Sequence, residues 1–135
     1  KLKGSFVPPH VIKLDNINQL TQEHFGPILH IVTFKPEEME QLPQRVNSTG
    51  FGLTFGLHSR IEDHWTLVQQ QIHAGNLYIN RNMTGAVVGV QPFGGEGLSG
   101  TGPKAGGPHY LHRFMTERTV TINTAAIGGN LELLS

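Results

Sequence analysis

Strand-forming apolar runs alternate with amphipathic helical segments along the middle of the chain, and this alternation most limits the possible folds. Strands are predicted at residues 11–14, 28–34, 51–57 and 76–80. Helices are predicted from Pro36 to just before Gly50 and from Ser59 to just before Gly75. This order is typical of βαβ units, so an α/β fold with a mainly parallel sheet is expected. The nearly continuous apolar run at 28–34 predicts a strand covered on both faces.

Each predicted helix has an apolar face and terminal signals. The first helix repeats apolar residues at helical spacing: Met39, Leu42 and Val46. The second places four apolar residues on one face: Ile61, Trp65, Val68 and Ile72. Pro43 is expected to bend the first helix. Ser59 and Glu62 have the spacing of a capping box, which predicts the start of the second helix.

A glycine-rich segment follows the last of these strands. Seven of the fourteen residues from Gly94 to Gly107 are glycine, so irregular backbone is expected there. Residues 95–100 match the G-x-G-x-x-G pattern, but a dinucleotide fingerprint also needs a helix to start immediately afterwards. Pro103 and Pro108 are incompatible with such a helix, and this interpretation is therefore rejected. A phosphate-binding Walker loop is rejected too, because its lysine–hydroxyl pair is replaced by Pro103 and Lys104.

Residues typical of a β-strand follow the glycine-rich segment. Residues 119–123 alternate threonine with Val120 and Ile122, with no helix beside them in the sequence. A strand there needs the edge of another sheet, because unpaired strand edges are usually covered. We therefore divide the chain into a βαβ portion at residues 1–112 and a terminal strand and tail at residues 113–135.

Composition excludes several classes of function. Ten basic and ten acidic side chains balance, so neither nucleic acid nor an anionic membrane is an expected partner. The absence of cysteine excludes disulfides, thiolate metal sites and a thiol nucleophile within this chain. His109 and His112 lack neighbouring carboxylates, so no metal site is predicted. No apolar run approaches 18 residues, so no membrane span is expected. The lack of cysteine fits a reducing compartment, and a cytoplasmic location is expected. Because the first residue is Lys1 rather than methionine, we interpret the chain as part of a longer protein.

Two short motifs resemble the aldehyde dehydrogenase superfamily. They are Glu23-His24-Phe25-Gly26-Pro27 and Gln91-Pro92-Phe93-Gly94-Gly95, the latter followed by Ser99-Gly100-Thr101-Gly102. The run at 80–108 is similar to the narrower family of proline utilization A proteins, and residues 124–131 resemble their terminal motif. Members of that family join an FAD-dependent proline dehydrogenase to an NAD-dependent L-glutamate γ-semialdehyde (1-pyrroline-5-carboxylate) dehydrogenase. The resemblance implies that this chain is the second half of an aldehyde dehydrogenase catalytic domain, with a carboxy-terminal oligomerisation strand.

The resemblance also assigns expected roles to residues. Glu23 corresponds to the carboxylate that accepts hydrogen bonds from the nicotinamide ribose, and Phe25 to the aromatic beside the nicotinamide. Gly85 and Ala86 correspond to the loop whose backbone amides anchor the substrate α-carboxylate. Phe93 corresponds to the aromatic that packs on the aliphatic stem of the substrate. Each assignment has an alternative: Glu23 as a surface residue, Phe25 and Phe93 as core residues, and Gly85-Ala86 as a turn that binds no ligand. His24 departs from the family pattern, which has an aliphatic residue there.

In the family, the attacking cysteine, the general base and the true dinucleotide motif precede the position of Glu23. The resemblance therefore implies no catalytic residue in this chain, which alone is expected to be inactive. The parent protein would oxidise glutamate γ-semialdehyde to glutamate with NAD, and FAD would belong to an upstream domain. Residues 116–135 are expected to contact another subunit of a homo-oligomer, and other parts of the parent could associate with a membrane surface. The alternatives are an aldehyde dehydrogenase for another substrate and a non-catalytic assembly module.

Overall fold

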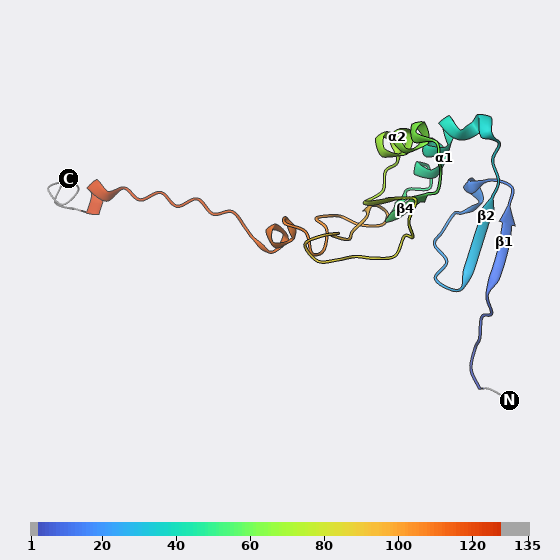
Figure 1. Cartoon of the computed structure of the whole chain (residues 1–135). Helices are drawn as coiled ribbons and strands as arrows, with labels where there is room; N and C mark the ends of the chain where they lie inside the picture. The colour runs from blue at the N-terminus through green and yellow to red at the C-terminus, as the bar shows by residue number, and fades with distance from the viewer. Residues whose placement is uncertain (1–2, 128–135) are drawn as a thin grey trace.

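The computed structural model describes residues 3–127, and its parallel strand pairs confirm the expected α/β class. Strand β1 (His10–Leu14) pairs with β2 (Ile28–Val32) in parallel, from His10 opposite Ile28 to Leu14 opposite Val32. The two strands lie side by side in Figure 1. Their connection contains a short 3-10 helix, η1 (Ile17–Gln19).

A complete βαβ unit follows β2 along the chain. Strand β4 (Thr54–Leu57) leads into helix α2 (Glu62–Gln71), which returns to β5 (Asn76–Ile79), parallel to β4. β5 ends at Asn80, whose φ of 54° lies in the left-handed region. The Asn80 side chain donates to Ser59 O and accepts from Ser59 N, both at 2.9 Å. These bonds fix the end of β5 against the loop that precedes α2.

The first predicted helix is present as two pieces. A 3-10 helix, η2 (Pro36–Gln41), continues into α1 (Leu42–Asn47), so the change of helix type occurs beside Pro43, where a bend is predicted. Gly50, with φ of 76°, ends the segment as expected.

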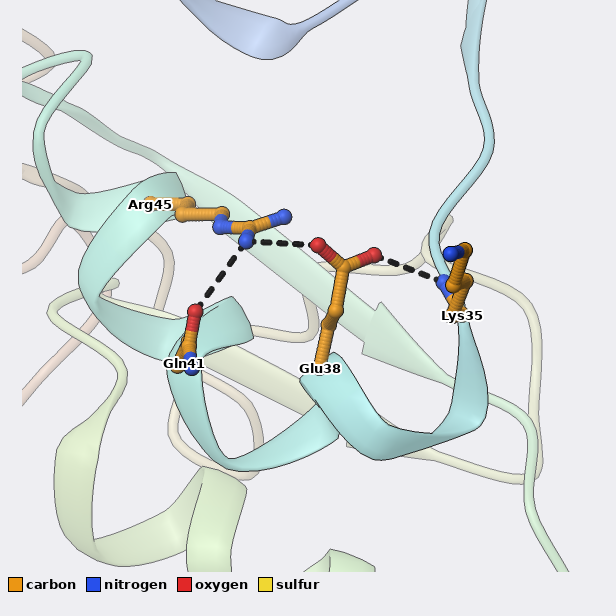
Figure 2. Close-up of polar contacts among 4 residues, drawn as sticks. All are labelled: Lys35, Glu38, Gln41 and Arg45. Carbon is orange, nitrogen blue, oxygen red and sulfur yellow. Dashed lines mark hydrogen bonds and ion pairs between the residues drawn. The ribbon is translucent and has the colours of Figure 1, made fainter.

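A polar cluster stabilises the junction between η2 and α1 (Figure 2). The Glu38 carboxylate accepts from Lys35 N at 2.8 Å and from Arg45 Nη2 at 2.8 Å. Arg45 also donates to the side chain of Gln41 at 3.1 Å. The backbone hydrogen bond from Lys35, followed by the contact with Arg45, lowers the pKa of Glu38 below its usual value. The carboxylate therefore stays ionised at neutral pH and holds the start of η2 against α1.

The core lies where η2, α1 and α2 pack against β4 and β5. Met39, Val68 and Ile72 are buried at its centre. Seven partly buried apolar residues surround them: Leu42, Val46, Phe55, Leu57, Leu67, Ala74 and Leu77. The predicted apolar face of the first helix is therefore confirmed. In the second helix Val68 and Ile72 are buried as predicted, whereas Ile61 is exposed because it precedes the first turn of α2.

The predicted strand at 51–57 is divided in two. Residues Phe51–Gly52 form β3, which pairs antiparallel with β6 (Glu96–Gly97), whereas β4 begins at Thr54 and pairs with β5. The division follows from a change of partner at Leu53, because the glycine-rich segment crosses beside β3. The described strands consequently form three separate two-stranded sheets rather than one continuous sheet.

The predicted capping box is wrong. Helix α2 begins at Glu62, so Glu62 lies in its first turn rather than at the third helical position. The Ser59 hydroxyl instead accepts from Ile61 N at 3.1 Å and contacts His64 Nδ1 at 3.0 Å. Glu62 and Asp63 still favour the helix start through their charge near its amino end.

The prediction that β2 is covered on both faces is also wrong within this chain. Leu29 is 56% exposed and Ile31 is 40% exposed, on the face that they share with Val11. The chain exposes 11293 Å² in total. A compact monomer of the same mass exposes roughly 7,000 Å². Much apolar surface is therefore left uncovered by the residues of this chain.

The predicted strand at 119–123 is not formed. Between η3 (Tyr110–Phe114) and η4 (Thr124–Ile127) the chain runs away from the rest of the molecule without pairing (Figure 1). Val120 and Ile122 are exposed there. A strand needs a neighbouring edge, and the described part of the chain presents none to the segment. Residues 128–135, which include the second half of the predicted terminal motif, lie outside the described residues.

Candidate functional site

The glycine-rich segment lies directly against the loop between α2 and β5. A Cβ added to Gly75 would lie 1.8 Å from Gly94 O, and one added to Gly100 would lie 2.5 Å from Gly95 O. Backbone therefore packs on backbone at both positions, which only glycine permits. This packing supports the interpretation that these glycines set loop geometry.

Three polar side chains hold the segment in place. Asn76 donates to Pro92 O at 3.0 Å and accepts from Gly94 N at 3.3 Å. Lys104 Nζ donates to Gly75 O, and Ser99 Oγ accepts from Gly52 N at 3.0 Å. The next helical element after Gly100 is the 3-10 helix η3, which starts at Tyr110. No helix therefore starts at the G-x-G-x-x-G pattern, as Pro103 and Pro108 predicted.

Glu23 and Phe25 lie in the loop between η1 and β2. Glu23 borders an open hollow of about 370 Å³, together with Leu20, Thr54 and Ser99. Phe25 is 91% exposed, so within this structure it is not a core phenylalanine. His24, which departs from the family pattern, lies 5.5 Å from His30 between ring centroids. An acidic acceptor thus borders the hollow, and an exposed aromatic ring follows it two residues later in the same loop.

Phe93 directly precedes the glycine-rich segment. It forms an isolated antiparallel bridge with Ala105, with N···O distances of 3.0 and 2.9 Å. It is half-buried and borders a second open hollow, of about 340 Å³, with Tyr110 and Phe114. Leu53 and Ser99 line both hollows. The Glu23 and Phe93 sides of the candidate site are therefore adjacent.

Gly85 and Ala86 occupy a separate exposed loop between β5 and Phe93. Gly85 has φ of 122°, a conformation suited to glycine. The loop is closed by a bridge between Val87 and Gln91 and is attached to the glycine-rich segment by Gly89 N donating to Gly106 O at 2.9 Å. The structure thus connects the predicted anchor to the segment that carries Phe93, although the two do not share either hollow.

Sequence reasoning missed the side chains that support this loop. Tyr78 on β5 donates to Gly85 O at 3.4 Å, and Arg81 Nη2 donates to Thr84 O at 3.2 Å. The Arg81 guanidinium lies 4.9 Å from the centre of the Tyr78 ring. Nothing in the spacing of these residues predicts their convergence, because it depends on how the loop folds back over β5.

Comparison with known proteins decides the family. The family model described as "Aldehyde dehydrogenase family" matches residues 1–120. The chain belongs to the aldehyde dehydrogenase family. It is 56% identical over 117 residues to the bifunctional protein PutA of Rhizobium meliloti, which covers 87% of this chain and 10% of that protein. It is 41% identical over 121 residues to a 1-pyrroline-5-carboxylate dehydrogenase of Bacillus licheniformis, which covers 88% of this chain and 23% of that enzyme.

Solved aldehyde dehydrogenase structures agree with the fold. A crystal structure of a mutant of Bradyrhizobium japonicum proline utilization A superimposes with a TM-score of 0.81 at 61% identity, covering 94% of this chain and 13% of that chain. A Thermus 1-pyrroline-5-carboxylate dehydrogenase with bound NAD superimposes with a TM-score of 0.73 at 41% identity, and the match covers 84% of this chain and 22% of that chain. This chain thus spans about a tenth of the bifunctional relatives and about a quarter of the monofunctional ones. No helix within residues 3–127 has the length and apolarity needed to cross a membrane.

Proposed function

We propose that this chain is the carboxy-terminal part of an NAD-dependent L-glutamate γ-semialdehyde dehydrogenase of the proline utilization A type. The observation that carries the proposal is Glu23 at the border of a hollow, two residues before the exposed ring of Phe25, in a chain 56% identical to PutA over 117 residues. The large uncovered apolar surface supports a chain that packs against further protein. The reaction oxidises the aldehyde of glutamate γ-semialdehyde to a carboxylate, which yields glutamate.

The residues on the cofactor side fit a nicotinamide nucleoside. The Glu23 carboxylate is exposed and can accept from both hydroxyls of a ribose. The Phe25 ring is free to pack beside a planar base. NAD, when bound, supplies the acceptor for the hydride that leaves the substrate. In this proposal Glu23 and Phe25 position the cofactor, and neither takes part in bond making.

The residues on the substrate side fit an aldehyde that carries a carboxylate. Gly85 and Ala86 present backbone amides in an exposed loop with small side chains, where an anion can approach closely. Phe93 offers an apolar surface to the aliphatic stem. The attacking thiolate, the general base and the dinucleotide-binding motif come from protein outside this chain in the proposal. FAD and proline oxidation belong to a further domain of a PutA-like parent, located in the cytoplasm.

The Glu23→Gln substitution in the whole protein tests the cofactor side. It preserves shape but removes the charge from the ribose contact, and hydrogen bonds to charged groups contribute about 1.5–3 kcal/mol. We expect NAD affinity or the rate of hydride transfer to fall roughly tenfold or more, with substrate affinity retained. Titration of both ligands, with Glu37→Gln on η2 as the matched control, measures this. If NAD affinity and the hydride step were both unchanged, Glu23 would have only a structural role.

The Ala86→Asp substitution tests the substrate side. A carboxylate beside the anchor repels the substrate carboxylate, and like charges in a confined site weaken binding by up to a few kcal/mol. We expect the apparent affinity for glutamate semialdehyde to fall by about tenfold to a hundredfold, with near-normal NAD affinity. Ala86→Asn, which adds similar volume without charge, separates repulsion from size. An equal loss of affinity for both ligands would contradict the anchor assignment.

We further propose that residues 116–135 join a sheet edge of another subunit. The exposed Val120 and Ile122 have no partner strand among residues 3–127, and such segments are usually covered. Deletion of residues 116–135 from the whole protein is expected to shift its mass in multi-angle light scattering toward the monomer. NAD binding should change less than assembly. An unchanged oligomeric mass would mean that the segment pairs only within its own subunit.

A further inference from the structure

The Gly85 carbonyl is held by two donors. Tyr78 Oη donates to it at 3.4 Å. The side-chain amide of Gln91 is oriented so that its oxygen faces the donor Arg81 Nη1 and its nitrogen faces the acceptor Gly85 O. In this orientation Gln91 Nε2 donates to Gly85 O at 3.0 Å. A carbonyl oxygen has two lone pairs, so these two bonds use its capacity fully. The orientation of the peptide that joins Gly85 to Ala86 is consequently fixed from the carbonyl side.

Fixing this carbonyl also fixes the Ala86 N–H. The only cis peptide bond within residues 3–127 joins Gly102 to Pro103, so the Gly85–Ala86 peptide is trans. In a trans peptide the N–H points opposite to the carbonyl. The Ala86 N–H therefore points away from Tyr78 and Gln91. In the described part of the chain it donates to no protein acceptor, and Ala86 is exposed.

Arg81 holds both donors in position. Its Nη1 donates to Gln91 Oε1 at 2.9 Å, and its guanidinium carbon lies 4.9 Å from the centre of the Tyr78 ring. Its remaining nitrogens donate to the carbonyls of Asn82 at 3.3 Å and Thr84 at 3.2 Å. Arg81 thus connects β5 with both ends of the loop that carries Gly85.

We propose that Tyr78, Arg81 and Gln91 are positioning residues that preset the Ala86 N–H as a donor to the α-carboxylate of the substrate. This inference rests on the proposed function. A donor that is fixed before binding loses little conformational freedom when the carboxylate arrives, so its full hydrogen bond contributes to affinity. Three side chains that never touch the substrate would then determine the preference for an amino-acid semialdehyde over an uncharged aldehyde.

Two variants of the whole protein test the inference. Tyr78→Phe removes one donor to Gly85 O and retains the ring beneath Arg81. Gln91→Glu retains an acceptor for Arg81 and removes the other donor. We expect each variant to lower kcat/KM for glutamate γ-semialdehyde by about threefold to tenfold, the effect of losing one hydrogen bond. The loss should appear in KM, whereas kcat/KM for pentanal and the affinity for NAD should stay unchanged.

The controls separate positioning from a general effect on the loop. Val88→Ala, at an 85% exposed position in the same loop, should leave kcat/KM unchanged for both aldehydes. Equal losses for glutamate γ-semialdehyde and pentanal would overturn the inference, because a carboxylate anchor acts on only one of them. Unchanged kinetics in both variants would overturn it as well. A wild-type protein without preference for glutamate γ-semialdehyde would instead overturn the proposed function, on which the inference depends.

Discussion

Gly75→Ala is expected to destabilise the region around β5 by at least about 3 kcal/mol, toward the upper end of the cost of overpacking a core. Its new methyl group would lie 1.8 Å from Gly94 O and 2.8 Å from Gly95 Cα. Both contacts are with backbone, so no side-chain rotation can relieve them. Relief requires the glycine-rich segment to move, which breaks the hydrogen bonds that Asn76 makes to Pro92 O and Gly94 N.

Hydrogen–deuterium exchange of the whole protein measures this effect locally. Amides at residues 76–79 should exchange roughly a hundredfold faster in Gly75→Ala, because local opening costs less free energy. Gly26→Ala is the matched control, since its methyl group would meet only the Ile28 side chain at 3.7 Å. Exchange at residues 76–79 as slow in Gly75→Ala as in the control would show that the two backbones are not in contact.

The 135-residue chain alone is expected to produce no NADH from glutamate γ-semialdehyde. Aldehyde dehydrogenase chemistry of the proposed kind begins with a thiolate that adds to the aldehyde, and this chain contains no cysteine. No other side chain here can replace that step with a comparable nucleophile. The expected rate is that of buffer, whereas the whole protein should be active.

Alkylation with iodoacetamide provides the control for this assay. The chain has no thiol to alkylate, so any activity that alkylation removes from its preparation belongs to a contaminating enzyme. The same reagent should inactivate the whole protein. NADH formation by the chain that resists alkylation and exceeds the buffer rate would show that the nucleophile is not a cysteine.

The features predicted correctly from the sequence are those set by local pattern. The βαβ unit from β4 to β5 and the stripe of Met39, Leu42 and Val46 follow from apolar periodicity, which reports directly on the face that packs. The glycines from Gly94 onward indicate irregular backbone because few other residues adopt the required conformations. The proline at position 43 correctly marks the change from 3-10 to α-helix.

The wrong predictions depend on partners that no local pattern contains. The strand at 51–57 divides at Leu53 because β3 pairs with β6 in the distant glycine-rich segment. The apolar run at 28–34 predicts coverage on both faces, but no residue among 3–127 covers the face with Leu29 and Ile31. Residues 119–123 have strand composition but find no edge in the part of the chain that the structure describes, so their pairing with another subunit stays a prediction. The support of Gly85 by Tyr78 and Gln91 likewise arises only when the loop folds.

We propose that this chain supplies the substrate anchor of a glutamate γ-semialdehyde dehydrogenase. The measurement that tests it most directly is NADH formation by the whole protein with glutamate γ-semialdehyde and, separately, with pentanal. Hydrogen bonds to a charged group contribute about 1.5–3 kcal/mol each, so two anchor bonds predict a kcat/KM at least about a hundredfold higher for the carboxylated substrate. Equal values for the two aldehydes, or a higher value for pentanal, would contradict the account.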